Sequence, residues 1–322
     1  MGRVENVLSS KLKTNRSKSR NQLLSKILGQ KYLLILVIPA ILWMFIFNYI
    51  PMYGLIIAFK KYDVFSGVFQ SPWVGLDNFK EMFLDPGFYH TVVNTLKISL
   101  LKLIIGFPLP ILFAIFLNEM KNQRLKKAVQ TVSYLPYFIS WAFVVSFMYI
   151  LFSPTEGLIN ELLVNLHLIK EPIFFLGEQK SFLMLVIASD IWKNLGWNAV
   201  IYFAAIVGID PQLYEAAIVD GAGRFNRMLR ITLPALKPTV LMLLILNISY
   251  LLGQNFDQLF LMQNSLTKDT ADIIDIYTYN LGLAMGRFSY ATTVGLFRSC
   301  IAAILLVSAN FASKKLTGES LF

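Results

Sequence analysis

The sequence predicts an all-α fold, a polytopic membrane helix bundle with six transmembrane helices, and three observations predict it. Of the 322 residues, 56% are hydrophobic and only 15% are charged, whereas a soluble domain carries roughly 25% charged residues. The mean hydropathy is +0.59. The apolar residues also form blocks long enough to cross a bilayer, which needs about 20 consecutive positions.

The predicted elements follow one another along the chain. Residues 1–30 are basic and polar and have no apolar face, which predicts a disordered cytoplasmic tail that touches anionic lipid headgroups. Residues 31–322 are expected to form one transmembrane domain. Its six predicted spans are Tyr32–Phe59, Val92–Leu117, Ala128–Phe152, Ser181–Gly208, Thr239–Gly253 with an extension toward Leu261, and Tyr290–Ala312.

The basic residues are distributed unevenly among the segments that connect these spans. Both terminal tails and the loops at 118–127 and 209–237 together hold 18 Lys and Arg residues, whereas the segments 60–91, 153–180 and 254–289 hold 7. Cytoplasmic segments carry the excess of Lys and Arg in membrane proteins. Both termini are therefore predicted to be cytoplasmic, and the net charge of +10 reflects membrane topology rather than affinity for nucleic acid.

Several classes of function lack their residues in this chain. The single cysteine, Cys300, and two distant histidines, His90 and His167, exclude a disulfide framework and an ordinary Cys/His metal site. No span carries a His/Asp/Glu cluster, and no HExxH motif occurs. The phosphate-loop pattern G-x-x-x-x-G-K-[ST] is absent as well, so the chain is not expected to hydrolyse ATP itself.

The polar loop at 209–238 lies between the fourth and fifth spans. Asp210 can cap a helix that has Pro211 in its first turn, and Asp220-Gly221 is expected to stop that helix, since Gly adopts the left-handed cap conformation at little cost. A second short helix is expected from Phe225 to Leu233, with Pro234 ending it. On pattern alone, the loop could equally be a connector packed under the bundle.

The residues in this loop resemble a known motif. Glu215-Ala216-Ala217, then Asp220-Gly221-Ala222, then Ile231-x-Leu233-Pro234 match the spacing of the "EAA" loop in permease subunits of binding-protein-dependent ABC importers. Asn48-Tyr49-Ile50-Pro51-Met52-Tyr53, Val74-Gly75-Leu76-Asp77-Asn78-Phe79, Asn94-Thr95-Leu96 and Trp192 with Gly196 also resemble the carbohydrate-uptake members of this family. The resemblance covers nearly the whole chain after residue 30.

The resemblance implies a type I ABC importer permease fold in the bacterial cytoplasmic (inner) membrane, and a set of partners. These are two ATPase subunits, a second permease subunit of a different but related sequence, an external substrate-binding protein and a carbohydrate, expected to be an oligosaccharide. ATP and Mg would be bound by the partner ATPase, and no cofactor by this chain. The residues implied to couple to the ATPase are Glu215, Ala216, Ala217, Asp220, Gly221, Ile231, Leu233 and Pro234.

Polar and aromatic residues inside the spans are candidates for the substrate passage, because charged groups in a span usually face a cavity or a partner. Asp190 and Lys193 are three positions apart, the spacing of an ion pair on a helix. Lys102 and Arg298 also lie deep in spans and are expected to need a carboxylate or carbonyl partner. The passage candidates are Asp190, Trp192, Lys193, Trp197, Asn198, Tyr202, Tyr250, Asn255 and Asp257, with Asn194 and Asn247 nearby.

Other interpretations remain open at this point. The charges could simply neutralise each other while the aromatic rings pack against lipid or a partner subunit. An ion-coupled secondary transporter could use Asp190 as its cation site, although such folds usually show repeats with broken helices in corresponding halves. That alternative leaves the loop at 209–238 unexplained, so the preferred interpretation is a carbohydrate importer permease.

Overall fold

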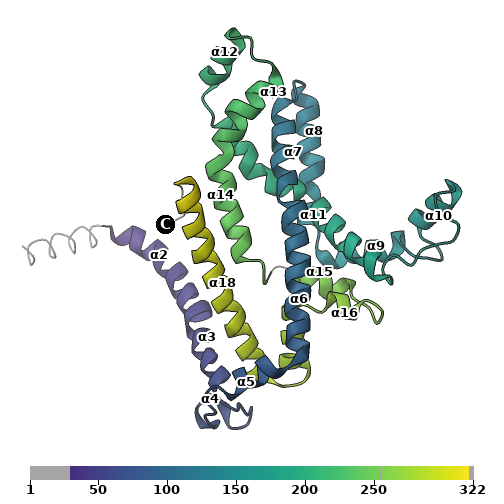
Figure 1. Cartoon of the computed structure of the whole chain (residues 1–322). Helices are drawn as coiled ribbons and strands as arrows, with labels where there is room; N and C mark the ends of the chain where they lie inside the picture. The colour runs from purple at the N-terminus through teal and green to yellow at the C-terminus, as the bar shows by residue number, and fades with distance from the viewer. Residues whose placement is uncertain (1–29, 254, 319–322) are drawn as a thin grey trace, which may run out of the picture. The chain divides into compact units, whose positions relative to one another are not determined.

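A computed structural model describes residues 30–253 and 255–318. The tail predicted to be disordered lies outside the described residues, apart from Gln30. The described part is helical, with one isolated bridge between Lys60 and Trp73. The chain divides into two compact units, 1–57 with 63–71, and 58–62 with 72–322. Figure 1 shows the elements of both units.

The first unit contains most of the first predicted span. It holds α2 (Lys31–Met44), a π-helical turn (Phe45–Tyr49), α3 (Ile50–Met52), the start of a 3₁₀ segment (Tyr53–Phe59) and α4 (Gly67–Gln70). The stretch Ile35–Phe59 is long and apolar enough to cross a membrane, as the sequence predicts. From Ile35 to Tyr53 every residue of this stretch is exposed, which is typical of a helix that faces lipid.

The first long helix of the second unit corresponds to the second predicted span. α6 (Pro86–Leu101), a π-helical turn (Lys102–Gly106) and α7 (Pro108–Glu119) form one apolar stretch of 34 residues. The Asp85 side chain caps its start by accepting a hydrogen bond from the Gly87 amide at 2.8 Å. The π-helical turn ends at Gly106, two positions before Pro108, and its wider backbone leaves room for the proline ring against the preceding turn.

The third predicted span, Ala128–Phe152, is not one continuous helix but a bent pair of helices that together are long and apolar enough to cross a membrane. α8 (Gln123–Tyr134) continues into a 3₁₀ turn (Leu135–Phe138), and α9 (Trp141–Leu151) then leaves at an angle of 100°. The break falls where Pro136 cannot donate a backbone hydrogen bond. Ser140 starts the new helix by accepting from the Phe143 amide at 3.4 Å. α10 (Leu158–Asn165) follows.

α11 (Gln179–Val207) corresponds to the fourth predicted span and packs against α7, α8 and α14 (Leu233–Ser249). It is 29 residues long, but Asp190, Lys193 and two asparagines make its middle more polar than the other spans. Among the described residues, four helices are long and apolar enough to cross a membrane, or five with the broken pair. The six predicted spans are thus confirmed in part.

The loop after α11 contains α12 (Pro211–Val219), α13 (Arg224–Arg227) and a π-helical turn (Met228–Thr232) that leads into α14. Pro234 does not end the second helix, as the sequence suggests, because it lies in the first turn of α14 directly after the π-helical turn. The predicted extension of the fifth span toward Leu261 is also wrong. α14 ends at Ser249, and a separate α15 (Phe256–Met262) follows.

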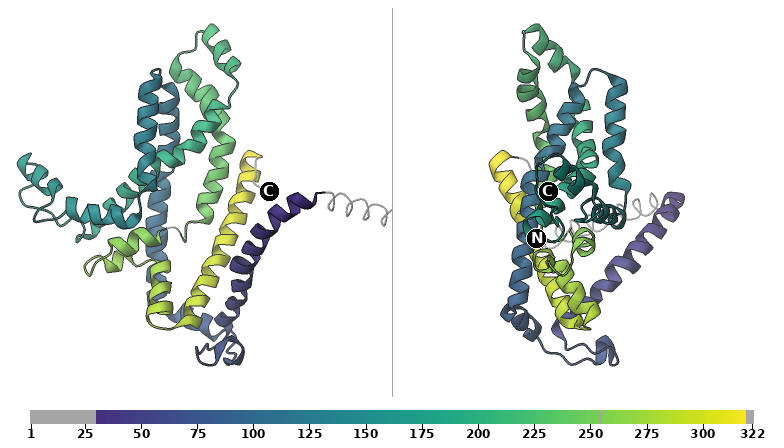
Figure 2. Two further views of the ribbon diagram at one scale, coloured as in Figure 1. Left: turned by 180° about the vertical axis from the view of Figure 1, so that it is seen from behind. Right: turned by 90° about the vertical axis from the view of Figure 1, so that its right-hand side faces the viewer.

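The end of the second unit opposite α12 is formed by short helices (Figures 1 and 2). They are α5 (Asp77–Leu84) and α17 (Ile274–Tyr279), and a π-helical turn (Asn280–Ala284) leads from α17 to α18 (Phe288–Thr317). α16 (Lys268–Ala271) lies beside α15 instead (Figure 1). α18 confirms the sixth predicted span. Its Arg298 pairs with Asp275 of α17, so the expected carboxylate or carbonyl partner is a carboxylate.

A hydrogen-bonded cluster ties these short helices to α6 and α18. The Asp85 carboxylate accepts hydrogen bonds from the hydroxyls of Tyr277 and of Tyr290, the latter at 2.7 Å. Burial, together with the bond to Asp85, raises the pKa of Tyr277 to about 12. Tyr277 therefore stays protonated and keeps donating throughout the ordinary pH range.

Candidate functional site

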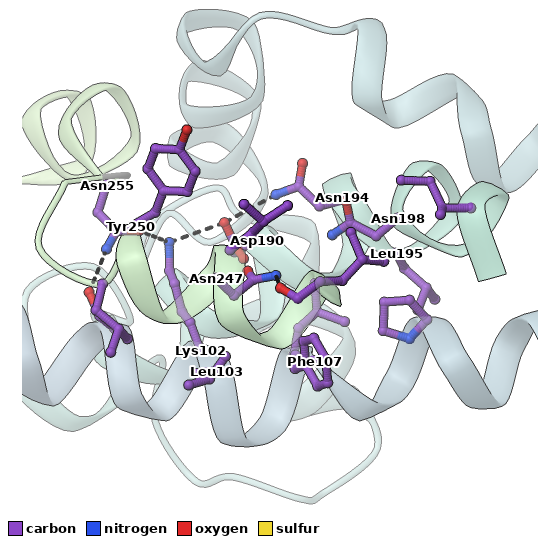
Figure 3. Close-up of a pocket in the computed structure, with 18 of the residues that line it drawn as sticks. Lys102, Leu103, Phe107, Asp190, Asn194, Leu195, Asn198, Asn247, Tyr250 and Asn255 are labelled. Atoms are coloured by element: carbon purple, nitrogen blue, oxygen red, sulfur yellow. Dashed lines mark hydrogen bonds and ion pairs between the residues drawn. The ribbon is translucent and has the colours of Figure 1, made fainter. Parts of the chain in front are cut away.

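A cavity of about 510 Å³ lies in the second unit, between the α6–α7 helix, α11 and α14 (Figure 3). Amide side chains from two of these helices project into it, namely Asn194 and Asn198 from α11 and Asn247 from α14. The aromatic residues that line it are Phe107, Trp141, Tyr202 and Tyr250. The cavity therefore combines hydrogen-bonding groups with flat apolar surfaces.

Lys102 lies at the edge of this cavity, where Figure 3 shows it beside Asp190 and Asn255. Its ammonium is 3.1 Å from the Asp190 carboxylate, and it donates to the side-chain oxygens of Asn255 at 2.6 Å and Gln258 at 2.5 Å. A buried ammonium group is costly unless it is paired and hydrogen-bonded. Lys102 meets that requirement with partners from two other segments.

The two amides around Lys102 are themselves fixed by further hydrogen bonds. Asn255 donates to the Ser99 hydroxyl at 3.2 Å. Gln258 donates to the Val186 carbonyl at 2.7 Å and to the Ser189 hydroxyl at 2.9 Å. We call the set Ser99, Lys102, Asp190, Asn255 and Gln258 the lysine network. It joins α6, α11 and the start of α15, so it closes one side of the cavity.

The predicted ion pair between Asp190 and Lys193 is wrong. Asp190 pairs with Lys102 and accepts a hydrogen bond from Asn194 at 3.2 Å. Lys193 is buried and donates to the carbonyl oxygens of Pro136 (3.2 Å), Tyr137 (2.7 Å) and Ile139. These carbonyls are available because the third span breaks there, and helix ends leave such acceptors unpaired.

Five of the nine predicted passage residues line the cavity, namely Asp190, Asn198, Tyr202, Tyr250 and Asn255. The other four lie elsewhere. Trp197 stacks on Tyr137 with ring centroids 4.5 Å apart, and Lys193 binds the carbonyls of the break. Trp192 is half exposed on another side of α11, and Asp257 is exposed and does not line the cavity.

The sequence list omits several residues that line the cavity, above all Ser99, Lys102, Phe107 and Trp141, whereas Asn194 and Asn247, named beside that list, line it as well. Lys102 and Asn247 give a signal, since each is a strongly polar residue within an apolar run. Phe107 and Trp141 give none, because an aromatic residue in a span is equally compatible with lipid contact.

The predicted coupling loop has well-defined helix ends. The Asp210 side chain caps α12 by accepting from the Gln212 amide at 2.9 Å, and Pro211 occupies its first turn, both as predicted. At the other end, Gly221 has φ +76°. The Ala222 amide donates to the Ala217 carbonyl at 2.8 Å and the Gly221 amide to Ile218 at 3.0 Å. This is the pattern of a Schellman motif, which requires the left-handed conformation at Gly221.

The surface of α12 is exposed around the predicted coupling residues. Glu215, Ala216, Asp220 and Gly221 are exposed, and Ala217 is half-buried. Large apolar side chains beside them are exposed as well, with Leu213 at 54%, Ile218 at 55% and Val219 at 87%.

Ile231, Leu233 and Pro234 lie outside α12, in the π-helical turn and at the start of α14. One side-chain hydrogen bond joins the two halves of the loop, between the hydroxyls of Tyr214 and Thr232 at 2.9 Å. It holds α12 against the turn that contains Ile231.

Comparison with known proteins identifies the family. Residues 106–317 match the model of the binding-protein-dependent transport system inner membrane component. The chain is 44% identical to Protein LplB of Bacillus subtilis (strain 168), over 91% of each chain. It is 43% identical to the polygalacturonan/rhamnogalacturonan transport system permease protein YteP of the same organism, over 95% of each.

Solved structures agree with these sequence relatives. A bacterial ABC transporter involved in the import of the acidic polysaccharide alginate contains a chain that is 38% identical, with a TM-score of 0.84. The match covers 92% of this chain and 99% of that one. A chain of a bacterial alginate ABC transporter, solved in complex with an alginate pentasaccharide-bound periplasmic protein, is 37% identical, also with a TM-score of 0.84.

These matches cover the cavity, α11 and the coupling loop together. They leave the ion-coupled secondary transporter without support, and the pairing of Asp190 with Lys102 accounts for the charge on which that alternative rested. The chain belongs to the binding-protein-dependent transport system inner membrane components and is the multi-pass permease subunit of an ABC importer.

Proposed function

We propose that this chain forms one half of the transmembrane passage for an oligosaccharide, and that the cavity in Figure 3 is part of that passage. The observation that carries the proposal is the lining of the cavity. Phe107, Trp141 and Tyr202 offer ring faces, and Asn194 and Asn198 offer amides. A sugar presents apolar C–H faces and hydroxyl groups, so both kinds of surface find a partner on it.

The size and charge of the cavity support the same assignment. Its volume of about 510 Å³ falls within the roughly 300–1,000 Å³ of small-molecule sites. The ion pair between Lys102 and Asp190 balances the two charges at its edge. Relatives whose names include polygalacturonan, rhamnogalacturonan and alginate handle carbohydrates of more than one sugar unit, which supports an oligosaccharide as the class of substrate.

The second part of the proposal concerns the loop. The residues Glu215, Ala216, Ala217, Asp220, Gly221, Ile231, Leu233 and Pro234 contact a separate ATPase subunit, which binds ATP and Mg. The full assembly contains two ATPases, a second permease that is a related but different chain, and an external binding protein. The exposed apolar side chains of α12 support this assignment, because a partner surface would bury them.

The proposed topology has six spans with both termini in the cytoplasm. α11 supplies the span that is too polar to be recognised by hydropathy, and the broken pair α8 and α9 supplies another. Loops with excess Lys and Arg then fall on the side of α12, in agreement with the positive-inside rule. Cysteine labelling in intact cells tests this topology, with Ala222→Cys expected to be protected from a membrane-impermeant reagent and Thr155→Cys expected to react.

The decisive experiment on the loop is a pull-down of the tagged chain in mild detergent, followed by mass spectrometry. We expect a phosphate-loop ATPase, a second polytopic subunit and, in the presence of sugar, a binding protein. Glu215→Lys should insert normally into the membrane and lose the ATPase. Glu171→Lys, the same change at an exposed site on the opposite side, is the matched control and should keep it. Retained ATPase and transport in Glu215→Lys would overturn the coupling role.

The passage assignment has its own test, which leaves the loop untouched. In the complete complex, Asn198→Leu and Asn247→Leu should each lower sugar uptake about tenfold or more, since each removes an amide partner for a hydroxyl in a site built for it. ATPase association should not change. Uptake unaffected by both substitutions would place the passage elsewhere.

A further inference from the structure

A second hollow lies on another side of α11, in the same unit as the cavity. Its volume is about 420 Å³, and almost all of its lining is apolar. Phe113 comes from α7, and Trp192 and Leu195 come from α11. The remaining lining residues are Ala128, Val129, Val132, Ser133 and Pro136, all from α8 and the turn after it. This hollow explains the position of Trp192, which the sugar passage does not use.

α8 carries an exposed apolar stripe over this hollow. Leu125 is 54% exposed, Val132 71% and Leu135 63%, and Ala128 between them is exposed too. Residues three and four positions apart share one helix face, so these side chains form a continuous apolar surface. A surface of this kind in a membrane protein contacts lipid or another subunit.

Basic side chains lie beside the stripe, at the end of α8 where the helix begins. Lys121, Arg124 and Lys127 are exposed, and within residues 30–253 and 255–318 none of them forms an ion pair. Arg124 precedes Ala128 by four positions and therefore lies on the same face as the stripe. Lys126 is directed elsewhere, over the ring of Phe203 at 4.6 Å. Glu119 is the nearby acid, so the region keeps a positive net charge.

We infer that this hollow binds one anionic phospholipid, with an acyl chain against Ala128, Val132 and Trp192 and the phosphate between Arg124 and Lys127. The apolar lining of the hollow suits an acyl chain, and the basic side chains at its edge suit an anionic headgroup. In the orientation proposed above, the edge faces the cytoplasmic leaflet, which carries the anionic lipids. The inference concerns a surface that the sugar does not reach, and it uses the proposed function only to choose the leaflet.

Charge favours a lipid over the second permease as the occupant. A protein partner on this face would have to cover Lys121, Arg124 and Lys127, and lysine is depleted from the cores of protein interfaces. A phospholipid leaves these groups at the membrane surface, where they remain hydrated while they attract the phosphate. The apolar hollow next to these basic side chains then holds one acyl chain of the same phospholipid.

The first test measures bound lipid. The complete importer complex is placed in nanodiscs of phosphatidylcholine with 20% phosphatidylglycerol, extracted, and examined by native mass spectrometry for retained phosphatidylglycerol. Each base near an anionic surface contributes roughly fivefold in affinity, so Arg124→Gln with Lys127→Gln should lower retention about tenfold to thirtyfold. The matched control, Arg230→Gln with Lys237→Gln, removes one exposed arginine and one exposed lysine elsewhere on the same side and should leave retention unchanged.

The second test identifies what covers the stripe. A photoreactive benzoylphenylalanine at position 132, in place of Val132, is irradiated in the native membrane. A lipid adduct on this chain supports the inference, and a cross-link to the second permease overturns it. Ala128→Phe fills the hollow and keeps the bases, so it should lower retention of phosphatidylglycerol at least fivefold. Equal retention in the wild type and in both the base and the Ala128→Phe variants would also overturn the inference.

Discussion

The lysine network and the α12 surface differ in how many of their side chains find a partner within this chain. At the network, the Lys102 side chain is 11% exposed and binds Asp190, Asn255 and Gln258. On α12, Val219 is 87% exposed, and a side-chain hydrogen bond between Tyr214 and Thr232 holds the helix to the turn after it. The network is therefore complete within this chain, whereas the α12 surface leaves large apolar side chains uncovered, as expected for half of the proposed interface.

This difference predicts where substitutions act. Changes at the network should alter the stability of the isolated subunit, because the interacting groups are all present in it. Changes on α12 should leave that stability almost unchanged and alter assembly instead. The following variants test this separation in order of the expected change in the free energy of unfolding.

The largest effect is expected for Lys102→Met. It leaves the Asp190 carboxylate without its cation and two amide oxygens without a donor, and breaking a buried pair costs about 3–5 kcal/mol. Because the Asp190 side chain is 25% exposed toward the cavity, we expect about 3 kcal/mol. Thermal unfolding of the purified subunit in detergent measures it.

Two controls separate charge from packing in that experiment. Adding Asp190→Asn to Lys102→Met removes the unpaired charge and should recover part of the loss. Lys80→Met breaks the exposed pair of Lys80 with Asp77, whose side chains are 73% and 67% exposed, and should cost less than about 1 kcal/mol. Similar losses in Lys102→Met and Lys80→Met would contradict the special position of the network.

The next effect is expected for Gly196→Ala on α11. A methyl group at Gly196 would overlap the backbone carbonyl of Ser133 on α8, and such overpacking costs about 1–3 kcal/mol. We expect about 2 kcal/mol in the same unfolding measurement. A methyl at Gly223 in the loop meets nothing within 4 Å, so Gly223→Ala should have no measurable cost. A stable Gly196→Ala subunit would show that α8 and α11 are less closely packed.

Gly221→Ala should have a smaller effect of another kind. The space around Gly221 is open, but its φ of +76° is a left-handed conformation, which costs a non-glycine residue about 1–2 kcal/mol. The strain falls on the Schellman end of α12, so the subunit as a whole should unfold almost normally. ATPase co-purification should fall about fivefold or more, while Gly223→Ala, with an ordinary φ, should retain it.

Val219→Ser should change the stability least. At 87% exposure, the side chain contributes within about 0.5 kcal/mol to folding. If α12 enters a cleft of the ATPase, the same substitution weakens that contact, and co-purification measured by quantitative blotting should decrease. An unchanged yield of ATPase would show that the partner covers a different face of α12.

The sequence predicts the loop better than the cavity because the loop is determined locally. Asp210, Pro211 and Gly221 act on backbone groups within a few residues, so the helix ends can be recognised without knowing the fold. Lys102 instead meets Asp190 and Asn255, which are 88 and 153 positions away. Helical spacing alone pairs Asp190 with Lys193, and only the break in the third span shows why Lys193 has other partners.

The errors in the predicted spans have a similar origin. Pro136 and Pro234 look alike in sequence, yet one coincides with a 100° bend and the other lies in a continuous helix. The difference depends on the surroundings. Lys193 occupies the freed carbonyls after Pro136, whereas a π-helical turn makes room for the ring of Pro234.

The helix Arg224–Ser249 is continuous, so a tilt at its beginning moves its far end. It begins beside α12 (Figure 1), and Asn247, two residues before its end, lines the cavity. At 1.5 Å per residue, the arm from Arg224 to Asn247 is about 35 Å long, so a tilt of about 5° displaces Asn247 by about 3 Å. That displacement equals the length of a hydrogen bond. In the proposed passage, a small movement of the loop is therefore sufficient to make or break a hydrogen bond between Asn247 and a sugar hydroxyl.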